Sequence, residues 1–320
     1  MIANLKKSTG CVFAFAIVAL FSTMVCAYVL QGPHVLQLMT EKMGQAKSLF
    51  VSQRVIFYNL QSQRESAGED VSPERLKSAD SVTGFQQGTP VDYGKPSVQP
   101  VVMQLDESLR YEFSEAFRSD IVSADNQRVF VFKDGQTLTV IDGAVSGTGE
   151  TRFDLYKDLL LYRSRELLCK RLSQLGVDVA VSSLGKFEGH LALVVGAEYP
   201  DETRSQVWIE MKTFRPLRML IPGSGRLDTA GFLEIRYSRW QEIGKIWYPM
   251  RIEFIEDGKI VRTIEVNDYQ INPHFDKDVF DIARLKHQYR QSTATPVRPA
   301  ENEGLSEVQK TIEEFKKIFE

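Results

Sequence analysis

Three segments in the second half of the chain alternate apolar and polar residues, and this pattern constrains the fold more than any other feature. An apolar residue at every second position is typical of a β-strand with one buried face. Antiparallel sheets tolerate one face in water, whereas parallel sheets are usually covered on both. The apolar positions are Val207, Ile209 and Met211, then Leu233, Ile235 and Tyr237, then Met250, Ile252 and Phe254. The sequence therefore predicts a large antiparallel sheet with one apolar face.

Asp-Gly pairs separate several of the strand-like runs. They occur at Asp134-Gly135, Asp142-Gly143 and Asp257-Gly258, between runs of β-branched or aromatic residues. Such pairs favour two-residue hairpin turns, because both turn residues need positive φ. We therefore expect an antiparallel meander over residues 111–141 and hairpin-linked strands from 177 to 280.

The second group of strands is expected to begin with the run VDVAV at residues 177–181. A long strand is also expected from residue 48 onward, where β-branched and aromatic residues are frequent. Together with the meander, these strands form the sheet that we predict.

Two stretches have apolar residues at helical spacing. Residues 33–43 are opened by the pair Gly32-Pro33 and ended by Gly44. Residues 153–175 begin beside Thr151 and Asp154, which have the spacing of a capping box, and form either one long helix or two short ones. A sheet with one wetted face needs a cover on the other, and these helices are the candidates.

The charge balance and the histidines argue against several classes of function. The chain has 42 acidic and 39 basic residues, a net charge of −3, so it lacks the basic field that nucleic acid binding requires. The four histidines, His34, His190, His274 and His287, show no paired metal-ligand spacing. We predict no nucleic acid partner, no metal and no cofactor.

Catalytic motifs are weak throughout the chain. Ser183 and Lys186 match the S-x-x-K spacing of some acyl enzymes, but two fixed positions recur by chance and the companion motifs are missing. Residues 147–149 form a Gly-Thr-Gly turn without the third glycine of a phosphate-binding loop. No pair of carboxylates stands out as an acid and a base. We therefore predict a protein that is not an enzyme.

The N-terminus indicates export. Lys6 and Lys7 precede an apolar run over residues 11–25, and the small-residue pattern at 25–27 is typical of a signal peptide, residues 1–27, cut after Ala27. The alternative is an uncleaved anchor, since an apolar stretch of about 20 residues can span a bilayer. In both cases the bulk of the chain is exported.

Two polar stretches interrupt the apolar pattern. Residues 61–100 are rich in Ser, Gly, Pro, Gln and Asp and are expected to form a mobile loop, because they offer little apolar area to bury. Residues 291–304 are expected to be a linker to an amphipathic C-terminal helix, 305–320. Its apolar face consists of Val308, Ile312, Phe315 and Phe319. That helix packs on its own domain or docks to a partner or to the mouth of the cavity.

Several runs of the chain resemble a known family. They read VWIEMKTFRPLRMLI, EIRYSRWQEIGKIWYPMRIEF, EDGKIVRTIEVNDYQIN and FDKDVFDI. In element order and strand pattern, residues 32–283 resemble the periplasmic lipoprotein-sorting carriers, the LolA-like group, and their relatives that sense envelope stress. One departure concerns the Arg-Pro pair that the carriers place before the second strand, where this chain has Leu105-Asp106. The role of that arginine in latching the lid is therefore not carried over to this chain.

The resemblance implies an α+β fold, in which a large curved, mostly antiparallel β-sheet forms an open half-barrel with helices covering its concave face. It also implies a periplasmic domain, residues 28–290, that shields acyl chains of a lipid or lipoprotein without catalysis. The predicted apolar pocket consists of Val207, Ile209, Met211, Leu233, Ile235, Tyr237, Met250, Ile252 and Phe254.

Two alternatives stay open. The first concerns function: the same sheet could bind a protein partner, as in an envelope sensor. The second concerns localisation: an uncleaved N-terminal segment would anchor the domain to the inner membrane. The C-terminal helix is a candidate contact to an envelope membrane protein.

Overall fold

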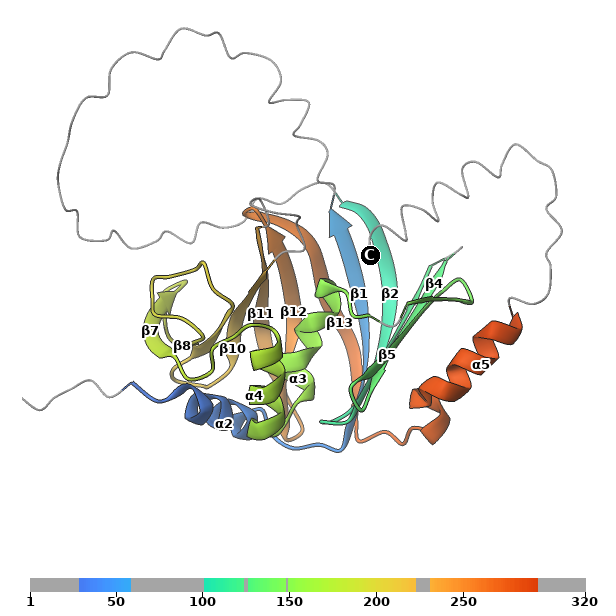
Figure 1. Ribbon diagram of the computed structural model, residues 1–320, viewed down its shortest axis with the longest axis horizontal. Coiled ribbons are helices and arrows are strands. Elements are labelled where there is room, and N and C mark those ends of the chain that lie inside the picture. Colours follow the sequence, from blue (N-terminus) through green and yellow to red (C-terminus); the bar gives the residue numbers. More distant parts are fainter. Residues whose placement is uncertain (1–28, 59–100, 124–125, 148, 223–230, 293–320) are drawn as a thin grey trace, which may run out of the picture.

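The computed structural model describes residues 29–58, 101–123, 126–147, 149–222 and 231–292 (Figure 1). The predicted signal peptide, the polar stretch 61–100 and the C-terminal helix lie outside the described residues, as does the linker apart from its first two positions. These expectations stay predictions. No helix within the described ranges is long and apolar enough to cross a membrane.

The described strands form one 13-stranded antiparallel sheet in the order β6-β5-β4-β3-β2-β1-β13-β12-β11-β10-β9-β8-β7. The first half consists of β1 (Ser48–Tyr58), β2 (Val101–Glu112), β3 (Ala116–Val122), β4 (Gln127–Lys133), β5 (Gln136–Ile141) and β6 (Ala144–Gly147). The second half consists of β7 (Ser182–Phe187), β8 (His190–Val195), β9 (Gln206–Glu210), β10 (Pro216–Pro222), β11 (Phe232–Ile243), β12 (Ile246–Glu256) and β13 (Lys259–Ile271). The predicted mostly antiparallel sheet is confirmed.

The two halves meet where β1 pairs with β13. Val55 on β1 lies opposite Leu105 on β2 and Ile264 on β13, so the register brings three buried side chains to one face. Register shifts interrupt the β1–β13 and β12–β13 pairs. Irregularities of this kind bend a sheet, and Figure 1 shows the sheet wrapping around helices as an open half-barrel.

The three Asp-Gly pairs form the tight turns that the sequence predicts. Asp134, Asp142 and Asp257 have φ values of 49°, 51° and 49°, and the glycine that follows each has a φ between 72° and 76°. Two successive positive φ values are required for the favoured two-residue hairpin turn. The turns join β4 to β5, β5 to β6 and β12 to β13.

Four short helical elements contribute side chains to the core that the sheet encloses. They are α2 (Gly32–Lys42), η2 (Arg152–Lys157), α3 (Asp158–Leu161) and α4 (Arg165–Gln174). Figure 1 shows α3 and α4 on the concave side of the sheet and α2 along the lower end of its strands. Thr151 and Asp154 form the predicted capping box at the start of η2. Ser164 caps α4 by accepting a hydrogen bond from the backbone N–H of Leu167. The apolar run 153–175 is therefore broken into short pieces, and we call η2, α3 and α4 together the helical cover.

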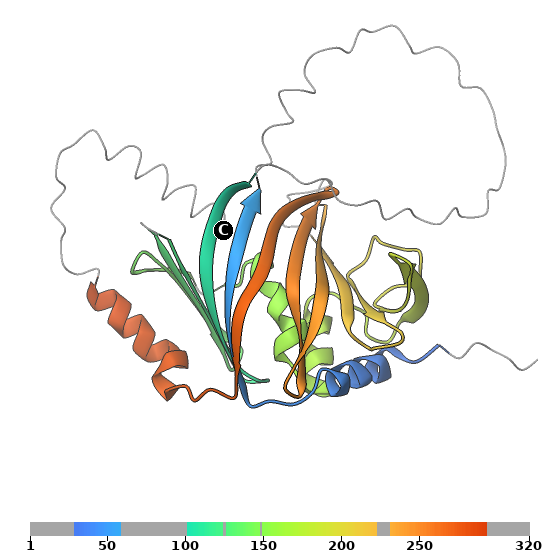
Figure 2. The same cartoon turned by 180° about the vertical axis from the view of Figure 1, so that it is seen from behind.

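A further helix, α5 (Ile282–Ser292), lies outside the half-barrel after η3 (Lys277–Phe280). Figure 2 shows it beside the first half of the sheet. Its apolar residues and those of η3 pack on the outward side chains of β3, β4 and β5: Phe280, Ile282 and Leu285 against Ala116, Val129, Val131, Leu138 and Val140. The expectation of a sheet with one face in water is thus wrong for this part, because β4 is apolar on both faces.

The expected strand at residues 177–181 is wrong as well. These residues turn, with the backbone N–H groups of Ala180 and Val181 donating to the side chain and the carbonyl of Asp178. The edge strand is β7 instead, and it carries the Ser183 and Lys186 positions of the weak catalytic match.

Candidate functional site

The concave face of the half-barrel is an apolar surface that gathers most of the predicted pocket residues. Seven of the nine are 0–2% exposed and belong to the main core cluster: Val207, Ile209, Leu233, Ile235, Tyr237, Ile252 and Phe254. Met250 is half-buried and packs against the same cluster. The structure therefore places eight of the predicted residues on one continuous surface, while their role in ligand binding stays a prediction.

Met211 does not lie on this surface. Strand β9 ends at Glu210, where the backbone N–H of Phe214 donates to the carbonyl of Glu210 in a tight turn. Met211 lies in this turn and is 46% exposed. The alternation of the sequence continues one residue further than the strand does, which explains the difference.

The helical cover closes the concave face by direct contact with the predicted residues. The rings of Phe153 and Tyr156 lie 5.7 and 5.8 Å from that of Phe254 in edge-to-face arrangements. The hydroxyl of Tyr237 donates to the backbone carbonyl of Tyr156 at 3.0 Å. Leu160 of α3 is fully buried in the same cluster. In this conformation cover side chains fill the space that the sequence assigns to a ligand.

A cluster of ion pairs holds the elements of the cover together. Lys157 and Asp158 are fully buried and paired at 2.9 Å, and Asp158 also accepts from Arg171 at 2.7 Å. Glu150 contacts both Lys157 and Arg171. Burial alone lowers the pKa of Lys157, but the carboxylates of Asp158 and Glu150 raise it above the ordinary lysine value. The two positive and two negative charges neutralise one another, so the helical cover brings no net charge from this cluster into the core.

Acid is expected to weaken this cluster. Burial alone raises the pKa of Glu150, but Lys157 and Arg171 bring it below its ordinary value; for Asp154, Arg128 does the same against burial. A carboxylate whose pKa is lower in the folded state stabilises the fold above the unfolded pKa, near 4, and loses this stabilisation as pH falls through the folded pKa. We therefore expect the free energy of unfolding to decline below about pH 4.5.

Urea unfolding between pH 7 and pH 2.5 measures this decline. Glu150→Gln should lower the stability at pH 7 and flatten the acid slope, because the variant has one fewer carboxylate to protonate. Glu242→Gln, an exposed position on β11, serves as the control. If the free energy of unfolding declines equally steeply with acid in wild type and Glu150→Gln, Glu150 does not contribute to the decline.

Polar groups also lie within the concave core, which the sequence analysis missed. Glu107 on β2 is 3% exposed and accepts hydrogen bonds from Gln53 and Ser119, both at 2.5 Å. The hydroxyls of Tyr111 and Tyr248 lie 3.0 Å apart. The sequence did contain a signal for a polar group in the core. Glu107 stands at one of the alternate positions that are otherwise occupied by the apolar residues Leu105, Leu109 and Tyr111.

The other candidate residues do not converge on the concave face. Ser183 donates to the carbonyl of Ala197 at 2.9 Å and accepts from the N–H of Tyr199 at 2.8 Å, while Lys186 is exposed. Trp208 is buried in a separate cluster with Phe187. Within the described ranges, no group of three or more His, Cys, Asp or Glu residues is arranged to hold a metal ion.

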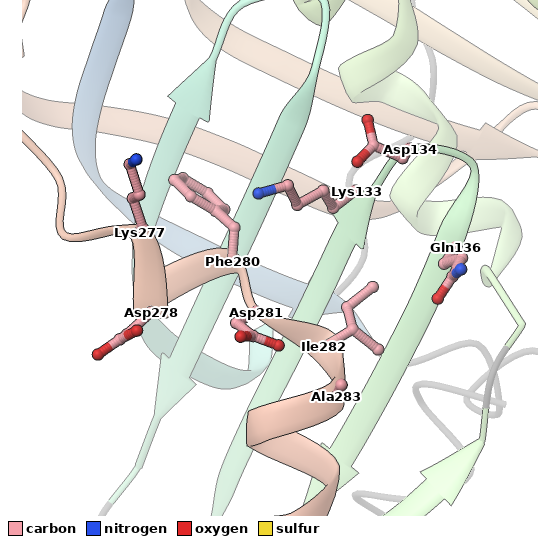
Figure 3. Close-up of a pocket in the computed structure, with 9 residues that line it drawn as sticks. All are labelled: Lys133, Asp134, Gln136, Lys277, Asp278, Phe280, Asp281, Ile282 and Ala283. Atoms are coloured by element: carbon pink, nitrogen blue, oxygen red, sulfur yellow. The ribbon is translucent and has the colours of Figure 1, made fainter.

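A cavity of about 320 Å³ lies outside the half-barrel, between the β4–β5 turn and the start of α5. Figure 3 shows charged side chains of both signs around it, including Lys133, Asp134, Lys277 and Asp281. Such a lining does not suit an acyl chain, because it would desolvate charges against methylene groups. The concave face is therefore the better candidate site.

Comparison with solved structures finds chains of similar fold at low sequence identity. Similar structures include an outer membrane lipoprotein-sorting protein domain from Vibrio parahaemolyticus, with 10% identity, a TM-score of 0.46, and coverage of 79% of this chain and 97% of the other. A LolA superfamily protein from Nitrosomonas europaea has 12% identity and a TM-score of 0.44, covering 79% of this chain and 99% of its own. A DUF1329 family protein from Desulfovibrio piger has 12% identity and a TM-score of 0.45, with coverage of 79% and 97%.

No protein-family model matches the chain, and no curated protein matches it in sequence. At these identities and TM-scores the structural matches carry no argument about ligand or partner. The assignment of an open half-barrel rests on the strand order and on the helices that the sheet encloses.

Proposed function

We propose that this protein is a periplasmic carrier that shields acyl chains of a lipid or lipoprotein between its concave sheet and its helical cover. The observation that carries the proposal is the apolar concave surface, which among the described residues is covered by the short elements η2, α3 and α4. Val207, Ile209, Leu233, Ile235, Tyr237, Met250, Ile252 and Phe254 are the proposed contacts.

The energetics of transport favour such an arrangement. Moving an acyl chain through water requires burial worth about 0.8 kcal/mol per methylene, or roughly 12 kcal/mol for a chain of 16 carbons. In this structure the helical cover packs on the concave face, so the apolar surface does not face water. A chain that enters replaces the contacts of cover residues such as Leu160 with its own, and the two occupants compete for one surface.

This competition can be tested with two buried leucines. Leu160 lies in the cover, whereas Leu138 lies under α5 on the outer side of the sheet, and both are 0% exposed. Leucine to alanine at either position is expected to cost about 2–5 kcal/mol of stability. Only Leu160→Ala weakens the closed state against the liganded one, so it should bind a fluorescent fatty acid more tightly than wild type, while Leu138→Ala should bind as wild type does.

Four results bear on the proposal. Lipid extracted from the purified mature protein and identified by mass spectrometry supports it, as does tighter probe binding by Leu160→Ala alone. The absence of probe binding by wild type up to the solubility limit would contradict it. Specific capture of an envelope protein by lipid-free material would favour a sensor that uses the same sheet.

A further inference from the structure

Arg163 lies in the joint between α3 and α4, where the residue as a whole is half-buried and its guanidinium group is buried. Its backbone N–H donates to the hydroxyl of Ser114 at 3.0 Å, which fixes the joint against the β2–β3 turn. Its guanidinium lies over the ring of Phe113, 4.5 Å from the ring centroid. All three guanidinium nitrogens are buried, and none has a hydrogen-bond partner in the described part of the chain.

The other buried arginines of the concave core have carboxylates nearby. Arg128 pairs with Asp154 at 2.7 Å, and Arg262 has an oxygen of Glu107 at 3.9 Å. No ion pair to Arg163 is found among the described residues. Burial lowers the pKa of Arg163 to about 10, even though Tyr111 and Tyr248 act in the opposite direction. The side chain is therefore a cation at neutral pH, and its charge lacks the compensation that the other two have.

The ring of Tyr111 stacks on that of Phe113, which lies beneath this guanidinium, with the ring centroids 5.8 Å apart. Both Tyr111 and Tyr248 interact electrostatically with the guanidinium. Tyr111 on β2 and Tyr248 on β12 lie 3.0 Å apart, so one hydroxyl donates to the other. The second hydroxyl hydrogen has no acceptor among the described residues. Burial raises the pKa of both tyrosines, so both hydroxyls stay protonated at neutral pH. The site thus offers a cationic fork and a hydroxyl donor, and among the described residues it lacks an anionic partner for them.

We propose that Arg163, Tyr111 and Tyr248 bind the ionised head group of a lipid, a carboxylate or a phosphate, whose acyl chain occupies the concave core. The inference rests on the proposed function, since it assigns a head group to the ligand of the same site. A guanidinium matches carboxylate and phosphate oxygens with two parallel N–H donors, and bonds between charged partners are stronger than neutral ones.

The position of the tyrosines connects this head-group site to the proposed chain site. Tyr248 lies on the same face of β12 as Ile252 and Phe254, four and six residues further along the strand. At about 3.3 Å per residue, these positions lie roughly 13 and 20 Å from Tyr248. A chain that starts at the tyrosine pair and follows β12 passes Met250, Ile252 and Phe254 in turn.

The test compares ligands that share a chain and differ in the head group. Palmitate, hexadecyl phosphate and methyl palmitate compete with a neutral fluorescent acyl probe at pH 8, with the full mature chain as receptor. Wild type is expected to bind the two ionised lipids at least tenfold more tightly than the ester. Arg163→Met should bind all three alike, and inorganic phosphate should fail to compete with either protein.

Unfolding of the ligand-free proteins separates a binding role from a structural one. Arg163→Met is expected to be at least as stable as wild type, because it removes an uncompensated buried charge. Arg128→Met is the matched control and is expected to lose stability, because it takes the arginine away from buried Asp154. Loss of stability in Arg163→Met without any change in ligand preference would assign Arg163 to the fold and overturn the inference.

The remaining outcomes distinguish this inference from the proposed function. Equal affinity of wild type for palmitate and its methyl ester would overturn the head-group site and leave the carrier intact. Failure of every chain-bearing compound to bind would overturn the carrier itself. Competition by inorganic phosphate as strong as that by hexadecyl phosphate would identify a site for free anions and overturn the lipid assignment.

Discussion

Asp158→Asn is expected to lower the free energy of unfolding by about 3–5 kcal/mol, the range for breaking a buried ion pair. Asp158 is fully buried and pairs with Lys157 at 2.9 Å and with Arg171 at 2.7 Å. Asparagine keeps the shape but removes the charge, so two cations then share the single carboxylate of Glu150. Lys157 is itself fully buried among the rings of Phe117, Phe130 and Phe132, where water cannot replace the lost partner.

Chemical unfolding measures the loss, and hydrogen exchange locates it. If the cover opens before the sheet, amide exchange in Asp158→Asn should rise in residues 152–174 while β1, β12 and β13 stay protected. Glu166→Gln is the control, because its ion pair with Arg165 at the start of α4 is exposed and is expected to contribute little to stability. Equal stability of Asp158→Asn and wild type would show that the buried cluster does not hold the cover.

The antiparallel sheet could be predicted because its signals are local. Alternation along β11 and β12 and the Asp-Gly turns depend on neighbouring residues, and the structure confirms both. The face of β9 that was expected to be polar is buried instead, because Trp208 packs in the cluster with Phe187. The packing of η3 and α5 on the sheet could not be predicted from local signals. Their apolar residues, Phe280, Ile282 and Leu285, pack on the outward face of β4 and β5, which lies more than 130 residues away in the chain. A strand that is apolar on both faces is a signal for such a second cover.

The apolar side of the candidate site was predictable, and its polar side was not. Periodicity selects Ile235 or Ile252 as inward-facing, since every second residue of a strand shares a face. The contacts of Arg163 depend instead on where a helix joint meets the ends of two strands, and no spacing in the sequence brings Arg163 near Tyr111 and Tyr248. Met211 shows the converse limit, because alternation cannot tell where a strand stops.

Gly44→Ala is expected to cost roughly 2–5 kcal/mol, the sum of left-handed backbone strain and an overpacked contact. Gly44 follows α2 with a φ of +79° and bridges to Ile246 at the start of β12. An added Cβ would lie 1.9 Å from the backbone carbonyl oxygen of Lys245. Backbone cannot yield as a side chain can, so α2 or the β11–β12 turn has to move.

Gly143→Ala provides a matched control, because it separates conformational strain from contact. Gly143 has a φ of +76°, but an added Cβ would meet nothing within 4 Å, so only about 1–2 kcal/mol of strain is expected. The additional loss in Gly44→Ala, measured by urea unfolding, reports how firmly α2 is held against the β11–β12 turn. That contact matters for the site because Val35, Leu36 and Met39 of α2 are buried in the same core as the helical cover. Equal losses in the two variants would mean that the close approach of Gly44 and Lys245 does not position α2.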